Sequence, residues 1–321
     1  MMIGVLGTAA IAFRRFMPSL MKCGFFEFGG VASRDIAKTS KFTDLYGGKG
    51  YDSYESLLDD SGISCVYIPL PPALHYTWAK KALERGKHVM LEKPFTISLK
   101  NTSALIEFAK EKKLALHENY MFQYHGQIDW IKSKIPDLGD LRLIRIDFGF
   151  PFRGAEDFRY NKSLGGGALF DCGGYTIKLA SMLLGDSARL ISADLQRGRG
   201  LEVDLYGNAV LTNDEGLTAQ ISFGMDNEYR CSLDIWGARG SLSTDRVFTA
   251  PADFEPVLLI KSGSDIFETK LPADDAFEKS MAFFQDCILN KSGRELSYTD
   301  ILRQSELIED CIKRYSGQRQ N

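Results

Sequence analysis

The chain has 321 residues, of which 44% are hydrophobic and 25% charged, a composition typical of a globular protein of about two domains. Its 39 basic and 42 acidic residues leave a net charge of −3, which argues against nucleic acid or an anionic membrane as the main partner. Six scattered cysteines without a C-x-x-C pair argue against a disulfide framework and a zinc site, and the four histidines lack metal-ligand spacing. We therefore expect a cytoplasmic protein without a metal.

An apolar run at residues 3–13 opens the chain, but it is much shorter than the roughly 20 residues that a membrane-spanning helix needs. No basic residue precedes it, so it does not fit a signal peptide, and we expect no membrane partner. We interpret it as a buried strand followed by a turn.

Short apolar runs alternate with amphipathic stretches over the first 120 residues, which is typical of βαβ units around a parallel sheet. Ser98 is the expected N-cap of one helix, and Gly86 the expected left-handed residue after another. The expected strands are 2–6, 26–32, 65–68, 88–91 and 114–117, and the expected helices are 12–22, one from about 35, one through 74–83 and 98–112.

The pattern changes at about residue 140, where strand-like runs follow one another without intervening helices. The expected strands are near 141–150, 188–195, 202–212, 217–224, 230–236 and 256–260, with helices near 167–184, 274–290 and 298–315. In the first of these strands, Ile144, Ile146 and Phe148 share one face. The fold class is therefore α/β, with a Rossmann domain over 1–121 and an α+β domain with a large, open, mostly antiparallel sheet over 122–321. The last helix of the second domain could pack back on the first.

The first strand runs into a turn and a helix through the residues Gly4-Val5-Leu6-Gly7-Thr8-Ala9-Ala10-Ile11-Ala12. A dinucleotide needs this arrangement, because its pyrophosphate meets a small residue and the N–H groups at a helix N-terminus. Gly7 and Ala12 match the first and third positions of G-x-G-x-x-G/A, whereas Ala9 replaces the second glycine. Alone the motif is weak, and a structural turn in another α/β protein is the alternative.

The residues after the second strand bear on the choice of cofactor. An acidic residue at this place would bind the 2′-hydroxyl of NAD, but the chain has Ser33 and Arg34, which suit a 2′-phosphate. Asp35 could serve NAD or cap the next helix, and we favour the cap because the helical run follows at once. The sequence therefore predicts NADP in preference to NAD.

Two further strands end in residues of interest. Leu70 and Pro71 follow one strand, with His75 shortly after, and Glu92-Lys93-Pro94 follows the next. Ligands of open α/β sheets bind beyond the carboxyl ends of the strands, so the position of Lys93 favours a functional role. A solvated surface lysine is the alternative for Lys93, and a local hydrogen bond at a helix start is the alternative for His75.

The segment from Leu164 to Tyr175, LGGGALFDCGGY, is the most specific stretch of the chain. Asp171 and Tyr175 are four residues apart on an expected helix, so they share a face. Gly173 and Gly174 each cost about 1 kcal/mol relative to alanine in a helix, which suggests that something bulky lies against them. Close packing of the helix on the sheet is the alternative to a functional site.

Several stretches together resemble the Gfo/Idh/MocA oxidoreductases over nearly the whole chain. They are GVLGTAAIA, the triplet Glu92-Lys93-Pro94 and GGGALFDCGGY. The stretches AIAFRRFMPSL, VASRD, VYIPLPPALH, the run Glu118-Asn119-Tyr120-Met121-Phe122, FGMDNEYR and IWGARGSLSTDRVFTAP are similar to the NDP-hexose 3-ketoreductase branch of that family.

The resemblance implies roles for individual residues. Lys93 would be the catalytic lysine and Tyr175 the proton donor, and Lys93, Tyr175, Tyr229 and Thr249 would touch the sugar substrate. Ser33 and Arg34 would hold the 2′-phosphate. The full set of expected cofactor-binding residues is Gly7, Thr8, Ala9, Ile11, Ala12, Ser33, Arg34, Tyr54, Leu70, Pro71, His75, Glu92, Lys93, Pro94, Asn119, Arg159 and Asp171.

The resulting hypothesis is NADPH-dependent reduction of a keto group on a nucleotide-linked deoxyhexose. One alternative is an NADP-dependent aldose or trans-dihydrodiol dehydrogenase, and another is a non-catalytic NADP-binding sensor. The expected partners are a small sugar or nucleotide-sugar and further copies of this chain, forming a homodimer or homotetramer through the second sheet.

Overall fold

The apolar runs of the first 120 residues form one parallel sheet, as expected of strands covered on both faces. Its order is β3-β2-β1-β4-β5-β6. The strands are β1 (Met2–Leu6), β2 (Glu27–Ala32), β3 (Lys49–Tyr51), β4 (Cys65–Ile68), β5 (His88–Leu91) and β6 (Leu116–Glu118). The short β3 was not predicted.

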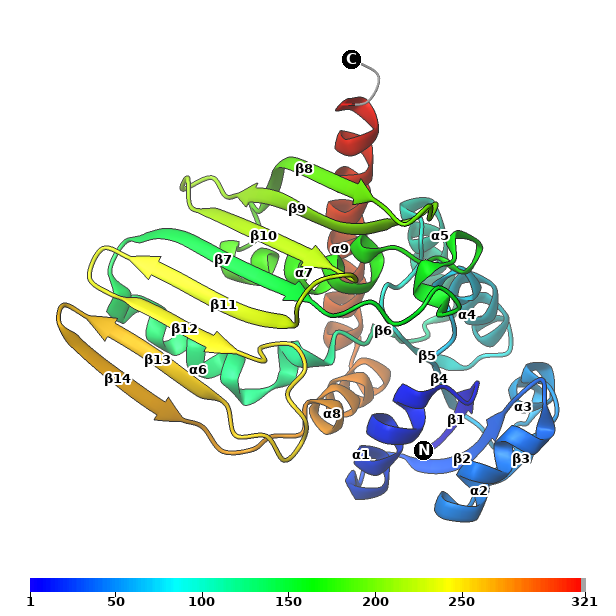
Figure 1. Ribbon diagram of the computed structural model, residues 1–321. Coiled ribbons are helices and arrows are strands. Elements are labelled where there is room, and N and C mark those ends of the chain that lie inside the picture. The colour runs from blue at the N-terminus through cyan, green and yellow to red at the C-terminus, as the bar shows by residue number, and fades with distance from the viewer. Residues whose placement is uncertain (319–321) are drawn as a thin grey trace. The chain divides into compact units, whose positions relative to one another are not determined.

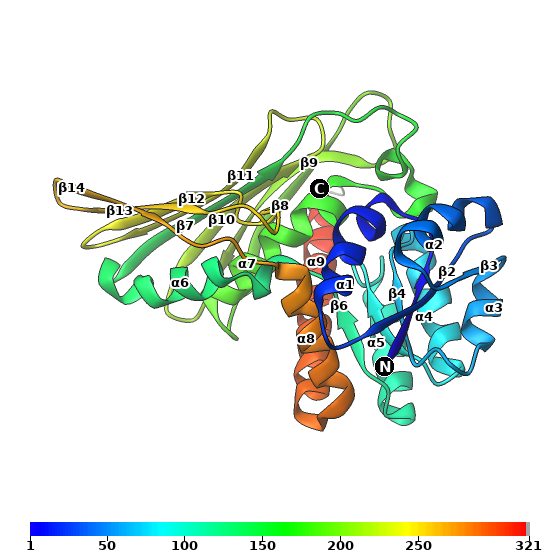
Figure 2. The ribbon, with the colours of Figure 1, turned by 90° about the horizontal axis from the view of Figure 1, so that it is seen from below.

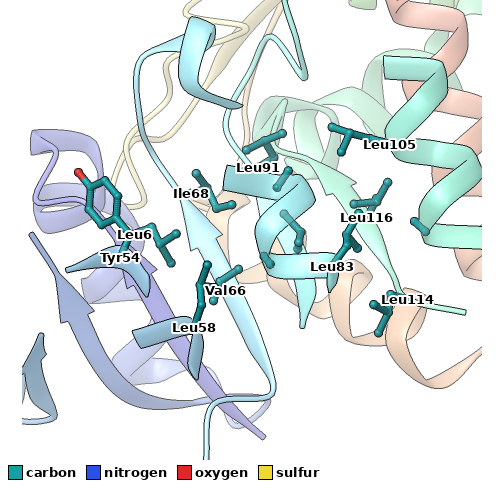
Figure 3. Packing of buried hydrophobic residues seen from close by; sticks show 14 of the residues in the cluster. Leu6, Tyr54, Leu58, Val66, Ile68, Leu83, Leu91, Leu105, Leu114 and Leu116 are labelled. Carbon is teal, nitrogen blue, oxygen red and sulfur yellow. The ribbon is translucent and has the colours of Figure 1, made fainter. Parts of the chain in front are cut away.

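Helices cover both faces of this sheet (Figure 1). Successive residues of β4 show the two faces, because Val66 and Ile68 join one core cluster while the Tyr67 ring stacks on Phe16 at 4.0 Å. In that cluster the strand side chains meet Leu83 and Leu105 from two helices (Figure 3). The helices are α1 (Met17–Lys22), α2 (Ser40–Tyr46), α3 (Tyr54–Asp59), α4 (His75–Glu84), α5 (Leu99–Lys112), α8 (Ala276–Leu289) and the first part of α9 (Lys291–Gln318).

Two helix-end predictions can be compared with the structure. Gly86 has φ 71°, which confirms the left-handed residue after α4. Ser98 occupies the N-cap position of α5, but its side chain makes no capping hydrogen bond. Thr96 instead fixes the Ser98 backbone, because its hydroxyl oxygen accepts the Ser98 N–H and its hydroxyl donates to the Ser98 carbonyl.

The second sheet has the order β14-β13-β12-β11-β7-β10-β9-β8 and is antiparallel except for the β7–β10 pair. Helices α6 (Gly126–Lys134) and α7 (Gly174–Leu184) lie on one face of it (Figure 2). The strands are β7 (Leu141–Gly149), β8 (Arg189–Arg197), β9 (Asp204–Thr212), β10 (Thr218–Gly224), β11 (Arg230–Gly237), β12 (Ser241–Asp245), β13 (Val257–Ser262) and β14 (Asp265–Lys270). Ile144, Ile146 and Phe148 of β7 are buried, as their alternation predicts.

The computed structural model describes residues 1–318, which divide into two units. Unit 1 comprises Met1–Met121 and Phe277–Ser305, and unit 2 comprises Phe122–Ala276 and the described residues from Glu306 onward. Phe277–Ser305 thus groups with the first 121 residues, and the first part of α9, the helix that we expected could pack back on the first domain, bonds to unit 1: Ser297 donates to the Leu116 carbonyl at 2.7 Å. Within residues 1–318, every helix is too short or too polar to cross a bilayer.

Candidate functional site

The turn after β1 requires a glycine at residue 7. Gly7 has φ 107°, and a Cβ there would lie 2.8 Å from the Leu70 side chain. Its N–H donates to the Ala32 carbonyl at 2.9 Å, which joins the turn to the end of β2. Ala9 is not among the non-glycine residues with positive φ in the described chain, so alanine replaces the usual second glycine without backbone strain.

A cavity of about 380 Å³ opens at the ends of β1 and β2 in unit 1. It is lined by Thr8, Ser33, Arg34, Asp35, Lys38 and Tyr54. Four residues expected to bind a cofactor are thus brought to one place, from the first turn, the end of β2 and the start of α3. Two of the six lining residues are cations and one is an acid.

Asp35 is engaged by the protein itself. It is the N-cap of the short helix Ile36–Thr39, and its Oδ1 accepts the Ala37 N–H at 3.2 Å. Its own N–H donates to the Ser33 hydroxyl oxygen at 3.2 Å, and the Lys38 ammonium lies 4.0 Å from its carboxylate. The structure therefore confirms the predicted cap, which leaves Arg34 and Lys38 as the cations on the cavity wall.

Tyr54 connects Arg34 to the cavity wall. Burial raises the pKa of the Tyr54 phenol, and the charge and hydrogen bond of Arg34 oppose that rise. Lys38 was not predicted as a cofactor-binding residue. The signal that could have found it is its position one helical turn after Ser33-Arg34-Asp35. A helix start with two cations and a hydroxyl suits a phosphate group.

His75 joins the loops that follow β4 and β5. Its Nδ1 lies 2.8 Å from the Pro94 carbonyl oxygen and its Nε2 lies 2.7 Å from that of Leu70. The side chain is fully buried, and this desolvation lowers the pKa of the imidazole while the carbonyl oxygens oppose the shift. The histidine therefore makes one local contact at the start of α4, to Leu70, and one long-range contact that fixes the backbone beside Lys93.

Glu92 places a carboxylate next to Lys93. Its Oε1 accepts hydrogen bonds from the Tyr67 hydroxyl and the Asn119 amide, both at 2.7 Å. Burial raises the pKa of Glu92, whereas these two hydrogen bonds and the charge of Lys93 oppose the rise. Just beyond Pro94, the Phe95 N–H donates to a Glu118 oxygen at 2.7 Å. The loop that carries the candidate lysine is thus held by β4 and β6.

In unit 2, Arg159 and Asp171 form an ion pair. The Arg159 Nε donates to Asp171 Oδ2 at 2.7 Å, and its Nη1 donates to Asp157 Oδ1 at 3.2 Å. Burial lowers the pKa of Arg159, but the two carboxylates outweigh this and raise it overall. Asp157 was not predicted; the sequence signal was its position two residues before the arginine.

Tyr175 lies in aromatic surroundings at the start of α7. Its ring centroid lies 5.3 Å from that of Phe148, 5.6 Å from Phe248 and 5.8 Å from Phe122. The residue is 8% exposed. Such packing restricts the orientation of the phenol ring.

The helix that carries Tyr175 begins with a π-helical turn, Leu169–Gly173, which precedes α7. The half-buried Asp204 of β9 accepts the Leu169 N–H at 2.7 Å, and desolvation raises the pKa of this carboxyl while that bond opposes the rise. A Cβ on Gly173 would lie 3.2 Å from the Phe223 ring. Phe223 of β10 is therefore the bulky group that the glycine predicted, which supports the packing interpretation of Gly173.

Tyr229 and Thr249 lie together in unit 2. Their hydroxyl oxygens are 2.7 Å apart, and the Thr249 hydroxyl also lies 3.6 Å from the Cys231 sulfur. The Arg246 guanidinium sits 5.7 Å from the centre of the Tyr229 ring. Two residues that only the resemblance selected thus form one polar cluster beside a cation.

The two candidate catalytic residues lie in different units: Lys93 belongs to unit 1 and Tyr175 to unit 2.

Two family models match the chain. The model described as "Oxidoreductase family, NAD-binding Rossmann fold" matches residues 1–120, and the "GFO/IDH/MocA C-terminal domain" matches residues 135–243. A dTDP-3,4-didehydro-2,6-dideoxy-α-D-glucose 3-reductase from Actinomadura kijaniata is 37% identical over 96% of this chain and 93% of its own. The D-xylose 1-dehydrogenase (NADP⁺) 2 of Haloferax volcanii is 31% identical over 88% of each chain.

Among solved structures, the 3-ketoreductase KijD10 from Actinomadura kijaniata in complex with NADP and TDP-benzene is similar throughout. It is 36% identical, with a TM-score of 0.94 over 98% of this chain and 97% of KijD10. Structures of KijD10 variants include lysine-to-alanine and tyrosine-to-phenylalanine substitutions.

Proposed function

The chain belongs to the Gfo/Idh/MocA oxidoreductase family, and from this premise we propose that it reduces the keto group of a nucleotide-linked deoxyhexose, using NADPH. The observation that carries the proposal is the cationic cavity at the end of β2, in a chain similar over its length to a dTDP-sugar 3-reductase. Arg34 and Lys38 give this cavity the charge that a 2′-phosphate needs.

NADPH supplies the hydride when it is bound. Its 2′-phosphate would be held by Ser33, Arg34 and Lys38, and its pyrophosphate would meet the turn at Gly7 and Thr8. The Asp35 carboxylate, which caps a helix, would not compete for the 2′-hydroxyl. In this proposal the chain selects NADPH because the hydroxyl of Ser33 and the cations of Arg34 and Lys38 stand where an NAD-binding protein would have an acidic residue for the 2′-hydroxyl.

Negative charge develops on the carbonyl oxygen of the sugar during reduction, so a cation and a proton donor are needed there. In the proposed mechanism Lys93 supplies the cation, and the Tyr175 hydroxyl delivers its proton to that oxygen. The phenolate that remains is stabilised by the lysine until a solvent proton restores it. The proposal is supported by the hydrogen-bonded carboxylate beside Lys93 and by the packed ring of Tyr175.

The test is NADPH oxidation, followed at 340 nm, with a panel of dTDP-linked 3-keto and 4-keto sugars. We expect turnover with a dTDP-linked 3-keto-2,6-dideoxyhexose and much less with free sugars. The observation that favours the aldose dehydrogenase alternative is the similarity to the D-xylose 1-dehydrogenase (NADP⁺) 2 of Haloferax volcanii. NADP⁺ reduction by free aldoses, without activity on any nucleotide-linked ketone, would establish that alternative instead.

We further propose that the second sheet pairs with another copy of the chain. Large apolar side chains on it are exposed, with Trp236 at 56%, Tyr206 at 47% and Ile191 at 47%. Trp236 alternates with the fully buried Ile235 along β11, so it lies on the face opposite the core. Light scattering should give a dimer or tetramer for the native chain and a smaller species for Trp236→Lys. A native monomer at micromolar concentration would contradict the proposal.

A further inference from the structure

A buried series of hydrogen bonds leads from β6 and α8 to Glu92. The His117 Nε2 lies 2.8 Å from the Ser280 hydroxyl oxygen, and that hydroxyl donates to the Asn119 Oδ1 at 2.8 Å. The Asn119 Nδ2 then donates to the Glu92 carboxylate at 2.7 Å. His117, Ser280 and Asn119 are each at most 1% exposed. Such a series is a costly arrangement for a protein interior unless its members are satisfied by one another.

The donors in this series all point in one direction. Because Ser280 has one hydrogen, which it gives to Asn119, its oxygen accepts from the N–H of His117. The orientation of the Asn119 amide can be assigned as well. If the amide were reversed, its oxygen would face an oxygen of the Glu92 carboxylate, and two acceptors would meet without a hydrogen between them. Each group therefore presents a hydrogen toward Glu92, and the carboxylate ends the series as an acceptor.

We propose that Asn119, Ser280 and His117, together with Tyr67, are positioning residues that keep Glu92 ionised and oriented beside Lys93, and that Asn119 serves this purpose rather than contacting the cofactor directly. The proposal rests on the proposed function, in which Lys93 is catalytic. It assigns a role to Ser280, on α8, which sequence reasoning did not select.

The groups that face Glu92 explain why such support is needed. The Tyr67 hydroxyl faces it from β4, Lys93 follows it in the chain, and Asn119 faces it from β6, with His117 reached through Ser280 of α8. Burial raises the pKa of Glu92, and the two hydrogen bonds and the lysine counteract this. Losing one donor therefore favours the protonated carboxyl, which no longer carries a charge beside Lys93.

Both polar atoms of the Asn119 side chain have a hydrogen-bond partner within unit 1. Its oxygen accepts from Ser280, its nitrogen donates to Glu92, and the residue is 0% exposed. A direct cofactor ligand would need a side-chain atom at the surface of the binding cavity. If Asn119 instead positions Glu92, both amide atoms keep the hydrogen bonds that they make in the structure.

The first test is the pH profile of kcat in Asn119→Leu and Tyr67→Phe, each of which removes one donor to the same Glu92 oxygen. Hydrogen bonds to a charged group are strong enough to shift the acid limb upward by about one to two pH units. Ser280→Ala should shift it in the same direction by less, because it only orients the amide. Tyr298→Phe is the matched control: it deletes a buried hydroxyl in unit 1 that donates to the Leu114 carbonyl, and it should leave the limb in place.

A second readout does not depend on activity. Because the folded-state pKa of Glu92 is raised, its ionisation removes stability as the pH rises above about 4.5. The gap in melting temperature between wild type and Asn119→Leu should therefore be wider at pH 8 than at pH 5, whereas the gap for Tyr298→Phe should stay constant.

The two readouts separate the possible failures. A wild type without ketoreductase activity would overturn the proposed function, and the melting-temperature gaps would still test the positioning role. An unshifted acid limb, or a gap that is constant with pH in Asn119→Leu and Tyr67→Phe, would overturn the positioning role. A raised KM for NADPH at every pH in Asn119→Leu, with the acid limb unmoved, would establish Asn119 as a direct ligand.

Discussion

The candidate catalytic residues of the two units, Lys93 and Tyr175, have different surroundings. In unit 1, Lys93 follows a strand of the parallel sheet, and its loop is fixed by the hydrogen bonds that Glu92 and His75 make. In unit 2 the phenol of Tyr175 is fixed by packing among three phenylalanines. The difference suits the two proposed roles, because a charge needs polar partners to remain ionised after burial, whereas packing of the ring sets the direction of a phenol.

Substituting the two candidate catalytic groups gives the largest expected effect and tests both halves of this comparison. Lys93→Met and Tyr175→Phe should each lower kcat by about 10²- to 10⁴-fold, the range for loss of a general acid or its supporting charge. NADPH titrations should show that binding is retained. The matched controls are Lys100→Met on the surface and Tyr160→Phe, a buried tyrosine of unit 2 that donates to the Met225 carbonyl. Near-normal turnover in both catalytic variants would remove the proposed roles.

The cavity cations come next. Arg34→Ala and Lys38→Ala should each raise the KM for NADPH about tenfold or more, since each removes a charge-assisted contact to the 2′-phosphate. The KM for NADH should change little, because NADH lacks that phosphate. Lys41→Ala is the control: Lys41 belongs to α2, and its ammonium sits over the Phe13 ring at 4.1 Å. An equal loss with both cofactors would mean that the cavity binds some other group.

The two units also differ in how much of their candidate site the sequence could predict. A parallel sheet brings the carboxyl ends of its strands to one edge, so the positions of Ser33, Arg34 and Lys93 follow from recognising the strands. An antiparallel sheet has no such edge, and Tyr229 and Thr249 were reached only through the family resemblance. Their 2.7 Å contact joins residues twenty positions apart, which no local pattern encodes.

The residues missed in unit 1 share a different cause. Lys38 lies one helical turn beyond Arg34, and its place on the cavity wall depends on where the cap at Asp35 starts that turn. Ser280 reaches Asn119 across 161 positions of sequence, and an isolated serine within an apolar helix carries no signal of its own. Tertiary contacts, rather than local patterning, select both residues.

Removing the Asp204 carboxylate tests whether packing alone holds the helix of Tyr175. Asp204→Ala leaves the Leu169 N–H without its partner and should lower the free energy of unfolding by about 1–3 kcal/mol. It should lower kcat less than Tyr175→Phe does, because the aromatic neighbours of the phenol remain. Asp204→Asn keeps an oxygen acceptor and should lose less stability in chemical denaturation. An unchanged stability in Asp204→Ala would show that the π-helical turn is held without this bond.

The smallest expected effect separates the two interpretations of Asp35. As a helix cap, its loss in Asp35→Ala should lower the free energy of unfolding by roughly 0.5–1 kcal/mol, and Asp35→Asn should retain most of it. The preference for NADPH over NADH should then not fall, because the cap makes no bond to the cofactor and its loss removes the carboxylate that lies 4.0 Å from the Lys38 ammonium. If Asp35 instead bound a 2′-hydroxyl, Asp35→Ala would raise the KM for NADH selectively. Measuring both KM values and the unfolding midpoint on the same preparation decides between them, because a cap affects stability alone whereas a ribose ligand affects the KM for NADH.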